Sequence, residues 1–234
     1  MTASLVAGAD EAGRGPVIGP LVICLAICAK ETEPDLRKMG VKDSKLLRPE
    51  RREELAPEVR KLCEVHVAKI TAKELNSLMQ KGVSLNAIEA MKLAELIREV
   101  DPRKLEKIET IHIDSPDPIA SKFSHRIKSY LPSSVKIEGK LHSSHKADVI
   151  YPVCSAASVI AKTVRDAEIE KIKKEVGCDF GTGYSHDAAT IACMEKYIET
   201  PTLSKYLRSE WSTTKNMLKK LKFKTKQVKL NLED

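Results

Sequence analysis

Four carboxylates lie where an apolar run of the sequence ends or a loop begins. They are Asp10 and Glu11 after the first apolar run, Asp114 after the run at 110–113, and Asp148 just before residues 149–151. In α/β proteins, residues far apart in sequence assemble sites at strand ends. Carboxylates brought close together repel one another and therefore require shared protons or cations. Because all-oxygen ligands favour Mg²⁺ or Mn²⁺ over zinc, these four acids are candidates for a divalent-metal site.

Such a site would suit phosphate chemistry. Two divalent ions about 3.5–4 Å apart can activate water on one side of a phosphate and stabilise the leaving oxygen on the other. The spacing by itself favours a plainer alternative. The chain has 33 acidic residues, and an acid taken singly is more often a solvated loop residue or a helix cap.

The charge balance fits a polyanionic partner. Lys and Arg number 40 against 33 Asp and Glu, which gives a net charge of +7. Arg14, Lys45 and Lys146 could contact phosphates or neighbouring acids. Taken singly, either lysine is better explained as a solvated surface charge. Charge by itself therefore permits nucleic-acid binding without requiring it.

The sequence contains neither a membrane span nor a cysteine framework. Its longest apolar stretch, 17–29, includes Gly19 and Pro20 and is too short to cross a bilayer. It also lacks the basic start and cleavage site of a secretory signal. The six cysteines include no Cys-x-x-Cys pair, which favours buried free thiols over zinc ligands or disulfides. We expect a cytoplasmic protein that is not associated with membranes.

The N-terminal third reads as strands with one helix between them. Apolar runs at 5–9 and 17–28 predict two paired strands joined by the Gly-Arg-Gly-Pro turn at 13–16. Residues 64–70 alternate between apolar and polar and predict a third strand. Residues 48–62 predict an amphipathic helix with an irregularity at Pro57.

The remainder alternates between helices and strands. Ser84 can cap a helix that runs to about residue 100, and 109–114 predicts a strand. Residues 135–137 are candidates for a further strand. Apolar residues at helical spacing from 153 to 176 predict one long helix.

This order of elements predicts an α/β fold, with a mixed sheet covered by helices on both faces. We expect a catalytic domain over 1–184. A helical C-terminal region with a basic tail should follow over 185–234.

Short motifs occur in a characteristic order from residue 5 to about residue 220. They are Gly-Ala-Asp-Glu-Ala-Gly-Arg-Gly-Pro-Val-Ile-Gly-Pro-Leu at 8–21, Val-Lys-Asp-Ser-Lys at 41–45, Ile-Asp-Ser-Pro at 113–116, Lys-Ala-Asp at 146–148, Tyr-Pro-Val at 151–153, Gly-Thr-Gly-Tyr at 181–184 and Arg-Ser-Glu-Trp at 208–211. Together they resemble the motifs of ribonuclease HII, the type 2 ribonucleases H, and the chain is similar to the archaeal branch. One departure lies at 185–186, where Ser-His replaces the Pro-Ser of many relatives. Another is Glu210, because many relatives have Arg-x-Ser-Trp there.

The resemblance implies a ribonuclease H-like fold, in which a five-stranded mixed sheet is flanked by helices and followed by a helical C-terminal region. It implies that Asp10, Glu11, Asp114 and Asp148 are catalytic and bind two Mg²⁺ or Mn²⁺ ions. It further implies an endonuclease that cuts RNA in RNA–DNA hybrids. Such an enzyme also cuts on the 5′ side of a ribonucleotide embedded in duplex DNA, leaving 3′-hydroxyl and 5′-phosphate ends.

The resemblance also suggests which residues bind the substrate. Gly13 and Gly15 lack Cβ and permit close backbone approach to a sugar, although a tight hairpin turn would use the same glycines. Tyr184 offers a ring for a sugar face and a hydroxyl for hydrogen bonding, whereas outside the motif it would read as a packing residue. Arg14, Lys45 and Lys146 complete the predicted set. The loop residues His142 and His145 have metal-like spacing but are not assigned as ligands, because the family's metal site is all oxygen.

Other functions remain open at this stage. A basic nucleic-acid-binding protein without catalysis is one, although retention of all four acids argues against it. A junction resolvase or a type 3 ribonuclease H is another, but a type 3 enzyme normally carries an additional N-terminal domain and Asp10 stands near the start. We expect a monomer. A sliding clamp is a further candidate partner, because residues 227–230 resemble the first half of a clamp-binding peptide, whereas Glu233 and Asp234 stand where two aromatics would be expected.

Overall fold

The computed structural model describes residues 4–41 and 47–220. The chain forms two compact units. The first comprises Met1–Gly13, Leu21–Lys69 and Ser84–Asp166, and the second comprises Arg14–Pro20, Ile70–Val83 and Ala167–Asp234. The division at residue 184 stays a prediction. Within the described ranges, no helix is long and apolar enough to span a membrane.

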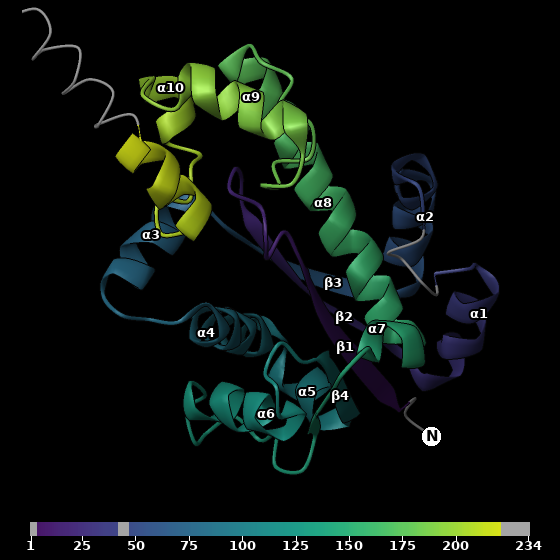
Figure 1. Cartoon of the computed structure of the whole chain (residues 1–234). Coiled ribbons are helices and arrows are strands. Elements are labelled where there is room, and N and C mark those ends of the chain that lie inside the picture. The colour runs from purple at the N-terminus through teal and green to yellow at the C-terminus, as the bar shows by residue number, and fades with distance from the viewer. Residues whose placement is uncertain (1–3, 42–46, 221–234) are drawn as a thin grey trace, which may run out of the picture. The chain divides into compact units, whose positions relative to one another are not determined.

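The first unit is built on a five-stranded mixed sheet with the order β3-β2-β1-β4-β5 (Figure 1). The strands are β1 (Leu5–Ala12), β2 (Leu21–Ala29), β3 (Glu64–Ile70), β4 (Ile108–Asp114) and β5 (Leu141–Ser144). β1 pairs antiparallel with β2 and parallel with β4, and β4 pairs parallel with β5. The predicted mixed five-stranded sheet is thereby confirmed, with β1 at its centre.

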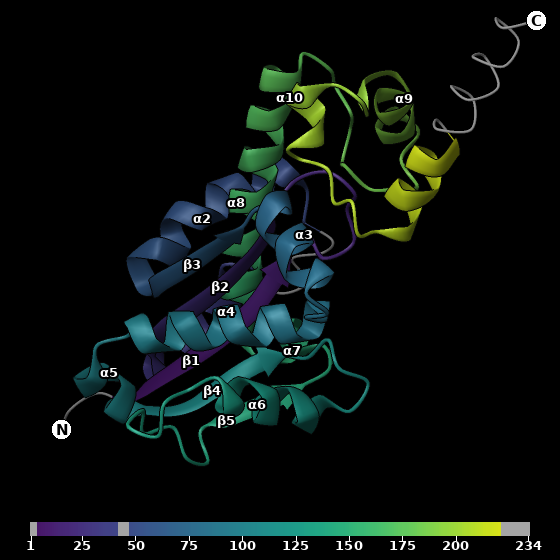
Figure 2. The same ribbon diagram turned by 90° about the vertical axis from the view of Figure 1, so that its left-hand side faces the viewer.

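Helices cover both faces of this sheet, as Figure 2 shows. They are α1 (Glu33–Lys38), α2 (Pro49–Leu62), α4 (Leu85–Glu99), α5 (Pro102–Lys107), α6 (Ala120–Ser129), α7 (Ala147–Ile150) and the first part of α8 (Pro152–Val176), with a short 3₁₀ turn at Lys30–Thr32. One face packs on α1, α2 and α8 through buried residues such as Leu36, Val59 and Ile160. α4 and α6 cover the other face (Figure 2). Ser84 caps α4 as predicted, accepting a hydrogen bond from the backbone N–H of Ala87 at 3.3 Å.

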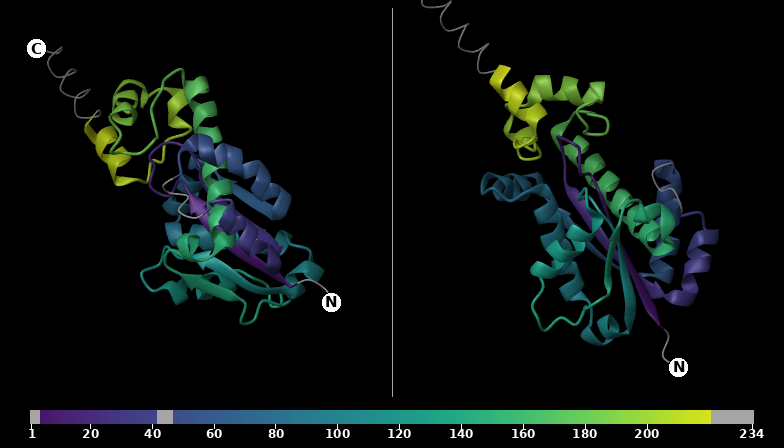
Figure 3. Two further views of the ribbon diagram at one scale, coloured as in Figure 1. Left: turned by 90° about the vertical axis from the view of Figure 1, so that its right-hand side faces the viewer. Right: turned by 60° about the horizontal axis from the view of Figure 1, so that its bottom comes forward.

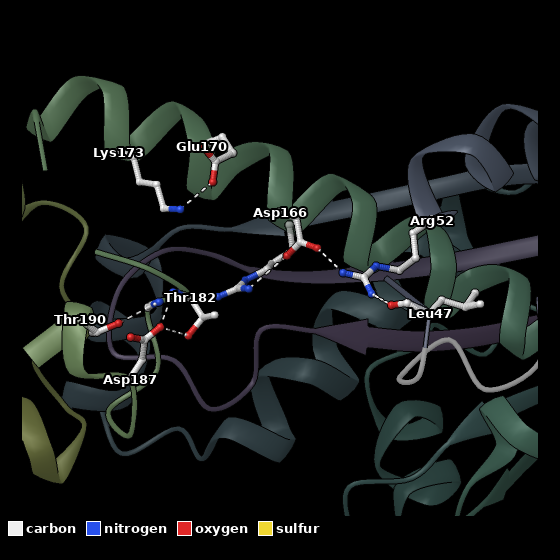
Figure 4. Close-up of polar contacts among 10 residues, drawn as sticks. Leu47, Arg52, Asp166, Glu170, Lys173, Thr182, Asp187 and Thr190 are labelled. Carbon is white, nitrogen blue, oxygen red and sulfur yellow. Dashed lines mark hydrogen bonds and ion pairs between the residues drawn. The ribbon is translucent and has the colours of Figure 1, made fainter. Parts of the chain in front are cut away.

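A glycine lets β1 lie directly on the start of α8. A Cβ added to Gly8 would come within 2.4 Å of the backbone nitrogen of Cys154. A second contact lies further along α8, where Nη2 of Arg52 on α2 binds Oδ2 of Asp166 at 2.7 Å (Figure 4). The first part of α8 is thus held against both β1 and α2, next to the strand that carries Asp10.

The second unit packs around its own apolar core. Its helices are α3 (Ala72–Gln80), the end of α8, α9 (Ala188–Tyr197) and α10 (Pro201–Ser204), and residues 212–220 are also helical (Figure 3). Ile18, Ile169, Phe180 and Met194 lie in this core. The helical character expected from residue 185 onward is therefore confirmed over the described residues.

Two predicted elements differ from the structure. β2 begins at Leu21, because residues 17–20 belong to the second unit, where Ile18 forms an isolated bridge with Leu207. Residues 135–137 form no strand, and the fifth strand is β5, whose Leu-His-Ser-Ser sequence lacks an apolar signal because it lies at the sheet edge. Pro57 lies inside α2 without ending it.

Candidate active site

Asp10 and Glu11 are neighbours on the central strand β1. Asp10 is buried, with 5% of its surface exposed, and Glu11 is half-buried. The backbone N–H of Glu11 donates a hydrogen bond to Oδ1 of Asp10 at 2.9 Å. Oδ2 of Asp10 is buried and has no hydrogen-bond partner among the described residues. This leaves an anionic oxygen that is available to a ligand.

Asp114 ends β4, the strand that runs parallel to β1. The register pairs Ala9 with Ile113, so Asp10 and Asp114 occupy the next position on neighbouring strands. Parallel strands carry their C-terminal ends to one edge of a sheet, where α/β sites assemble. Pairing of β1 with β4 therefore brings together two acids that lie about a hundred residues apart.

Asp148 reaches the same edge through a short helix, α7. Oδ1 of Asp114 accepts a hydrogen bond at 2.9 Å from the backbone N–H of Ala147, the first residue of α7. Lys146 precedes it in the left-handed conformation, with φ of 59°. Asp148 is 1% exposed, and its backbone carbonyl accepts a hydrogen bond from the hydroxyl of Ser155 on α8. The predicted third and fourth acids are thus linked through the backbone.

A small cavity of about 10 Å³ lies on this part of the first unit. Asp10, Glu11 and Asp114 line it together with Glu89, and its apolar walls are Ala9, Ile23, Leu93, Ile113 and Phe123. Glu89 is 2% exposed and was missed by the sequence reasoning. A signal for it existed, because Leu85, Glu89 and Leu93 follow one another at intervals of four, which places a carboxylate on one face of a helix.

Burial dominates the electrostatics of Asp10. It raises the pKa of Asp10 from 3.8 to about 6, against the lowering effects of Lys162 and of a hydrogen bond with Ser158. The negative charges of Asp114 and Asp148 raise it further. Ser158 and Lys162 stand one turn apart on α8, and Nζ of Lys162 donates to Oγ of Ser158 at 2.5 Å. Asp114 and Asp148 are thus close enough to Asp10 to raise its pKa.

The chemistry of these residues suits a hard divalent cation. The acids supply only oxygen ligands, and their negative charges repel one another. Oδ2 of Asp10 is buried and has no hydrogen-bond partner among the described residues. Within residues 4–41 and 47–220, however, no group of three or more His, Cys, Asp or Glu side chains is arranged so that it could hold a metal ion. The donor set therefore fits Mg²⁺ or Mn²⁺, provided that the side chains turn toward the ion.

The second unit brings together other predicted residues. A Cβ added to Gly15 would lie 3.1 Å from Cε1 of Tyr184, so the tyrosine ring packs against this exposed glycine. The carbonyl of Arg14 accepts a hydrogen bond from Nη1 of Arg208 at 3.1 Å. Gly15 thus contacts Tyr184, and Arg14 contacts Arg208, while the substrate-binding roles of these residues stay predictions.

Gly13 is the last residue of the first segment of the first unit and has φ of 84°. Lys146 belongs to the same unit and is exposed. Lys45 lies outside the described residues.

The cysteines and the histidines at 142 and 145 are not among the residues assigned to the site. All six cysteines are free thiols, and all but the half-buried Cys178 are buried. His142 lies on β5 and not in a loop, and its Nε2 contacts the carbonyl oxygen of Gly139 at 3.1 Å. His145 is exposed in the following turn.

Comparisons with known proteins agree on one family. The family described as Ribonuclease HII matches residues 7–214. The chain is 40% identical over 214 residues to the Ribonuclease HII of Archaeoglobus fulgidus, and this alignment covers 92% of this chain and 97% of the relative. It is also 40% identical over 231 residues to the Ribonuclease HII of Pyrococcus abyssi, covering 98% and 96% of the two chains.

Solved structures give the same answer. The ribonuclease H2 of Pyrococcus horikoshii OT3 has a TM-score of 0.78 at 36% identity and covers 93% of this chain and 99% of its own. The PCNA:RNase HII complex of Archaeoglobus fulgidus has a TM-score of 0.76 at 39% identity, covering 89% and 95%. A Bst-RNase HIII structure has a TM-score of 0.78 at only 23% identity and shares the fold, covering 92% of this chain and 70% of its own.

Proposed function

This chain belongs to the ribonuclease HII family and is a type 2 ribonuclease H, and from that premise we propose how and where it cuts. Its substrates are RNA–DNA hybrids and duplex DNA that contains embedded ribonucleotides. It cuts on the 5′ side of a ribonucleotide, leaving 3′-hydroxyl and 5′-phosphate ends. The observation that carries this proposal is the gathering of acids at one end of the sheet. Asp10 and Asp114 occupy matching positions on β1 and β4, and Asp114 binds the backbone N–H of the residue before Asp148.

Asp10, Glu11, Asp114 and Asp148 are the residues that would hold two Mg²⁺ or Mn²⁺ ions. When bound, such ions supply an activated water and stabilise the charge on the leaving oxygen. The chain's own contribution is to gather the acids and to limit their contact with water. Lys162 and Ser158 partly offset the cost of keeping Asp10 ionised in its buried position.

Substrate recognition falls to Gly13, Arg14, Gly15 and Tyr184, with Lys45 and Lys146 as phosphate contacts. Gly15 is exposed and lies against the Tyr184 ring, so a sugar that approached the glycine backbone would also meet the ring. A 2′-hydroxyl both donates and accepts hydrogen bonds, so backbone groups of this loop can distinguish ribose from deoxyribose. Arg14 and the two lysines add attraction to phosphates.

The decisive experiment uses a labelled DNA duplex with one ribonucleotide, incubated separately in Mg²⁺ and in Mn²⁺, with both product ends mapped. We expect one cut on the 5′ side of the ribonucleotide and no cut in an all-DNA duplex. Binding without any cleavage in either ion would favour the alternative of a nucleic-acid-binding protein without catalysis. Cleavage restricted to long hybrids would contradict the embedded-ribonucleotide proposal.

We also propose that a sliding clamp is a partner. The relative from Archaeoglobus fulgidus has been solved as a PCNA:RNase HII complex, and residues 227–230 of this chain resemble the first half of a clamp-binding peptide. These residues lie outside the described part of the chain. Calorimetric titration of the full chain into a purified archaeal sliding clamp tests the proposal, with a chain ending at Lys224 as the control.

A further inference from the structure

The turn at 181–184 is held from one side by the residue that caps α9. Oδ2 of Asp187 accepts hydrogen bonds at 2.8 Å from both the backbone N–H and the hydroxyl of Thr182 (Figure 4). Its other oxygen accepts the backbone N–H of Ala189 at 3.0 Å, as an N-cap. Hydrogen bonding to the Thr182 backbone, and then to its hydroxyl, lowers the pKa of Asp187. The carboxylate therefore remains ionised while it joins the turn to α9.

A second side chain of α9 closes the turn from within. Oγ1 of Thr190 donates to the carbonyl of Phe180 at 2.7 Å and accepts the backbone N–H of Gly183 at 3.1 Å. Thr190 is 0% exposed, so its hydroxyl spans the two ends of the turn inside the protein. A buried N–H and a buried carbonyl each lose a partner if this hydroxyl is removed, which is costly.

The same turn is hydrogen-bonded to the segment Arg14–Pro20 of the second unit. The carbonyl of Gly183 accepts the backbone N–H of Val17 at 2.8 Å and that of Ile18 at 3.3 Å. Gly183 has φ of 80°, a conformation that favours glycine. The next residue is Tyr184, whose ring packs on Gly15. Gly183 thus connects the hydroxyl of Thr190 to Tyr184 and Gly15, two of the residues that we assign to substrate recognition.

We propose that Thr190 is a positioning residue for ribose discrimination, acting by holding the 181–184 turn so that Tyr184 stays against Gly15. Asp187 supports the same turn from its exposed side. Because Thr190 is fully buried, it acts through Tyr184 and not by touching the substrate. This inference rests on the proposed function, since it presupposes that the enzyme cuts at embedded ribonucleotides.

The test compares Thr190→Val, which keeps the shape and removes the hydroxyl, with Thr190→Ser, which keeps the hydroxyl. We expect Thr190→Val to lower kcat/KM on the single-ribonucleotide duplex roughly tenfold, because buried backbone groups lose their partner. The loss on a long hybrid should be smaller, since that substrate offers a 2′-hydroxyl at every position. Thr190→Ser should restore most of the activity, and Asp187→Asn should shift the substrate ratio in the same direction.

Thr200→Val is the matched control, because Thr200 caps α10 in the same unit through a hydrogen bond from the N–H of Leu203 at 3.3 Å. It should lower the unfolding temperature without changing the ratio between the two substrates. A double-mutant cycle completes the design, and we expect Thr190→Val to have almost no further effect on that ratio in a Tyr184→Ala background.

Equal losses on both substrates from Thr190→Val, or an unchanged effect in the Tyr184→Ala background, would overturn the positioning role. If Thr190→Val does not fold, Asp187→Ala decides, because it removes the oxygen that accepts both Thr182 hydrogen bonds. An unchanged substrate ratio in that variant excludes positioning by this turn. Failure of the parent enzyme to cut the single-ribonucleotide duplex would instead overturn the proposed function, so the two failures are distinguishable.

Discussion

Oδ1 of Asp114 accepts the backbone N–H of Ala147 at 2.9 Å, so one candidate metal ligand also holds the residue that precedes another, Asp148. The two positions should therefore respond differently to substitution. Replacing Asp114 disturbs both a charge and the start of α7, whereas replacing Asp148 removes a charge without breaking this backbone contact.

Asp148→Asn is expected to abolish most turnover while hybrid binding stays largely intact. The change removes the charge of a candidate metal ligand and leaves the residues assigned to phosphate contact in place. Loss of a negative charge should even strengthen attraction to phosphates when no metal is present. Single-turnover cleavage and fluorescence anisotropy on the same hybrid measure the two quantities, and full activity would remove Asp148 from the metal site.

Asp10→Asn should stabilise the metal-free protein at neutral pH. Because burial raises the pKa of Asp10 to about 6, the folded state binds this proton more tightly than the unfolded state. The free energy of unfolding therefore falls as pH rises from about 4 to about 6, and the cost persists above that range. At pH 7.5 this cost is on the order of 1–3 kcal/mol, which corresponds to a few degrees in unfolding temperature.

Thermal unfolding in EDTA measures this effect. The unfolding temperature of the variant should exceed that of the parent at pH 7.5, and the difference should vanish near pH 4. Saturating Mn²⁺ should stabilise the parent more than the variant, because only the parent keeps the carboxylate. An identical pH profile for the two proteins would mean that burial does not raise the pKa of Asp10.

Tyr184→Ala should severely reduce cleavage at a single embedded ribonucleotide. Removing the ring removes the surface that packs on Gly15 and would face the sugar. Tyr184→Phe should be milder, because it keeps that surface and loses only a hydrogen bond of about 0.5–1.5 kcal/mol. Both variants are to be compared on single-ribonucleotide and long-hybrid duplexes. If Tyr184→Ala cuts both at the parental rate, the residue serves only in packing.

Arg208→Met should be among the most destabilising single changes in the second unit. Arg208 is 0% exposed, donates through Nε to the carbonyl of Gly19 at 2.9 Å, and packs over the Trp211 ring at 4.8 Å. The substitution leaves buried carbonyls without a donor, at about 1–3 kcal/mol each. Urea unfolding gives the loss of stability. A loss below about 1 kcal/mol would show that solvent or neighbouring groups replace these contacts.

Truncation after Lys224 should leave turnover at saturating substrate unchanged and weaken substrate binding at most slightly. The removed segment matches none of the catalytic motifs, and its lysines supply only attraction that salt screens. Salt titrations of KM for the full and truncated chains measure this contribution. A large fall in kcat at low salt would show that the tail helps to build the site.

The sequence by itself identified the acids that are candidates for the metal site. Asp10, Asp114 and Asp148 stand next to apolar runs with recognisable periodicity, because a buried strand must be apolar and a buried carboxylate can be retained only where it has a partner. The long helix from about 153 to 176 was likewise evident, since its apolar stripe follows helical spacing. β5 escaped prediction because a short, half-exposed edge strand needs no apolar pattern.

Only the tertiary structure decided which side chains meet. Parallel pairing of β1 with β4 places Asp114 beside Asp10, and no local signal encodes the register between strands so far apart in the chain. Glu89 joins the cavity because α4 packs on the sheet, although its sequence neighbourhood reads as an ordinary amphipathic helix. The role of Thr190 depends on hydrogen bonds to Phe180 and Gly183, and a threonine near a helix start gives no indication of the loop that it holds.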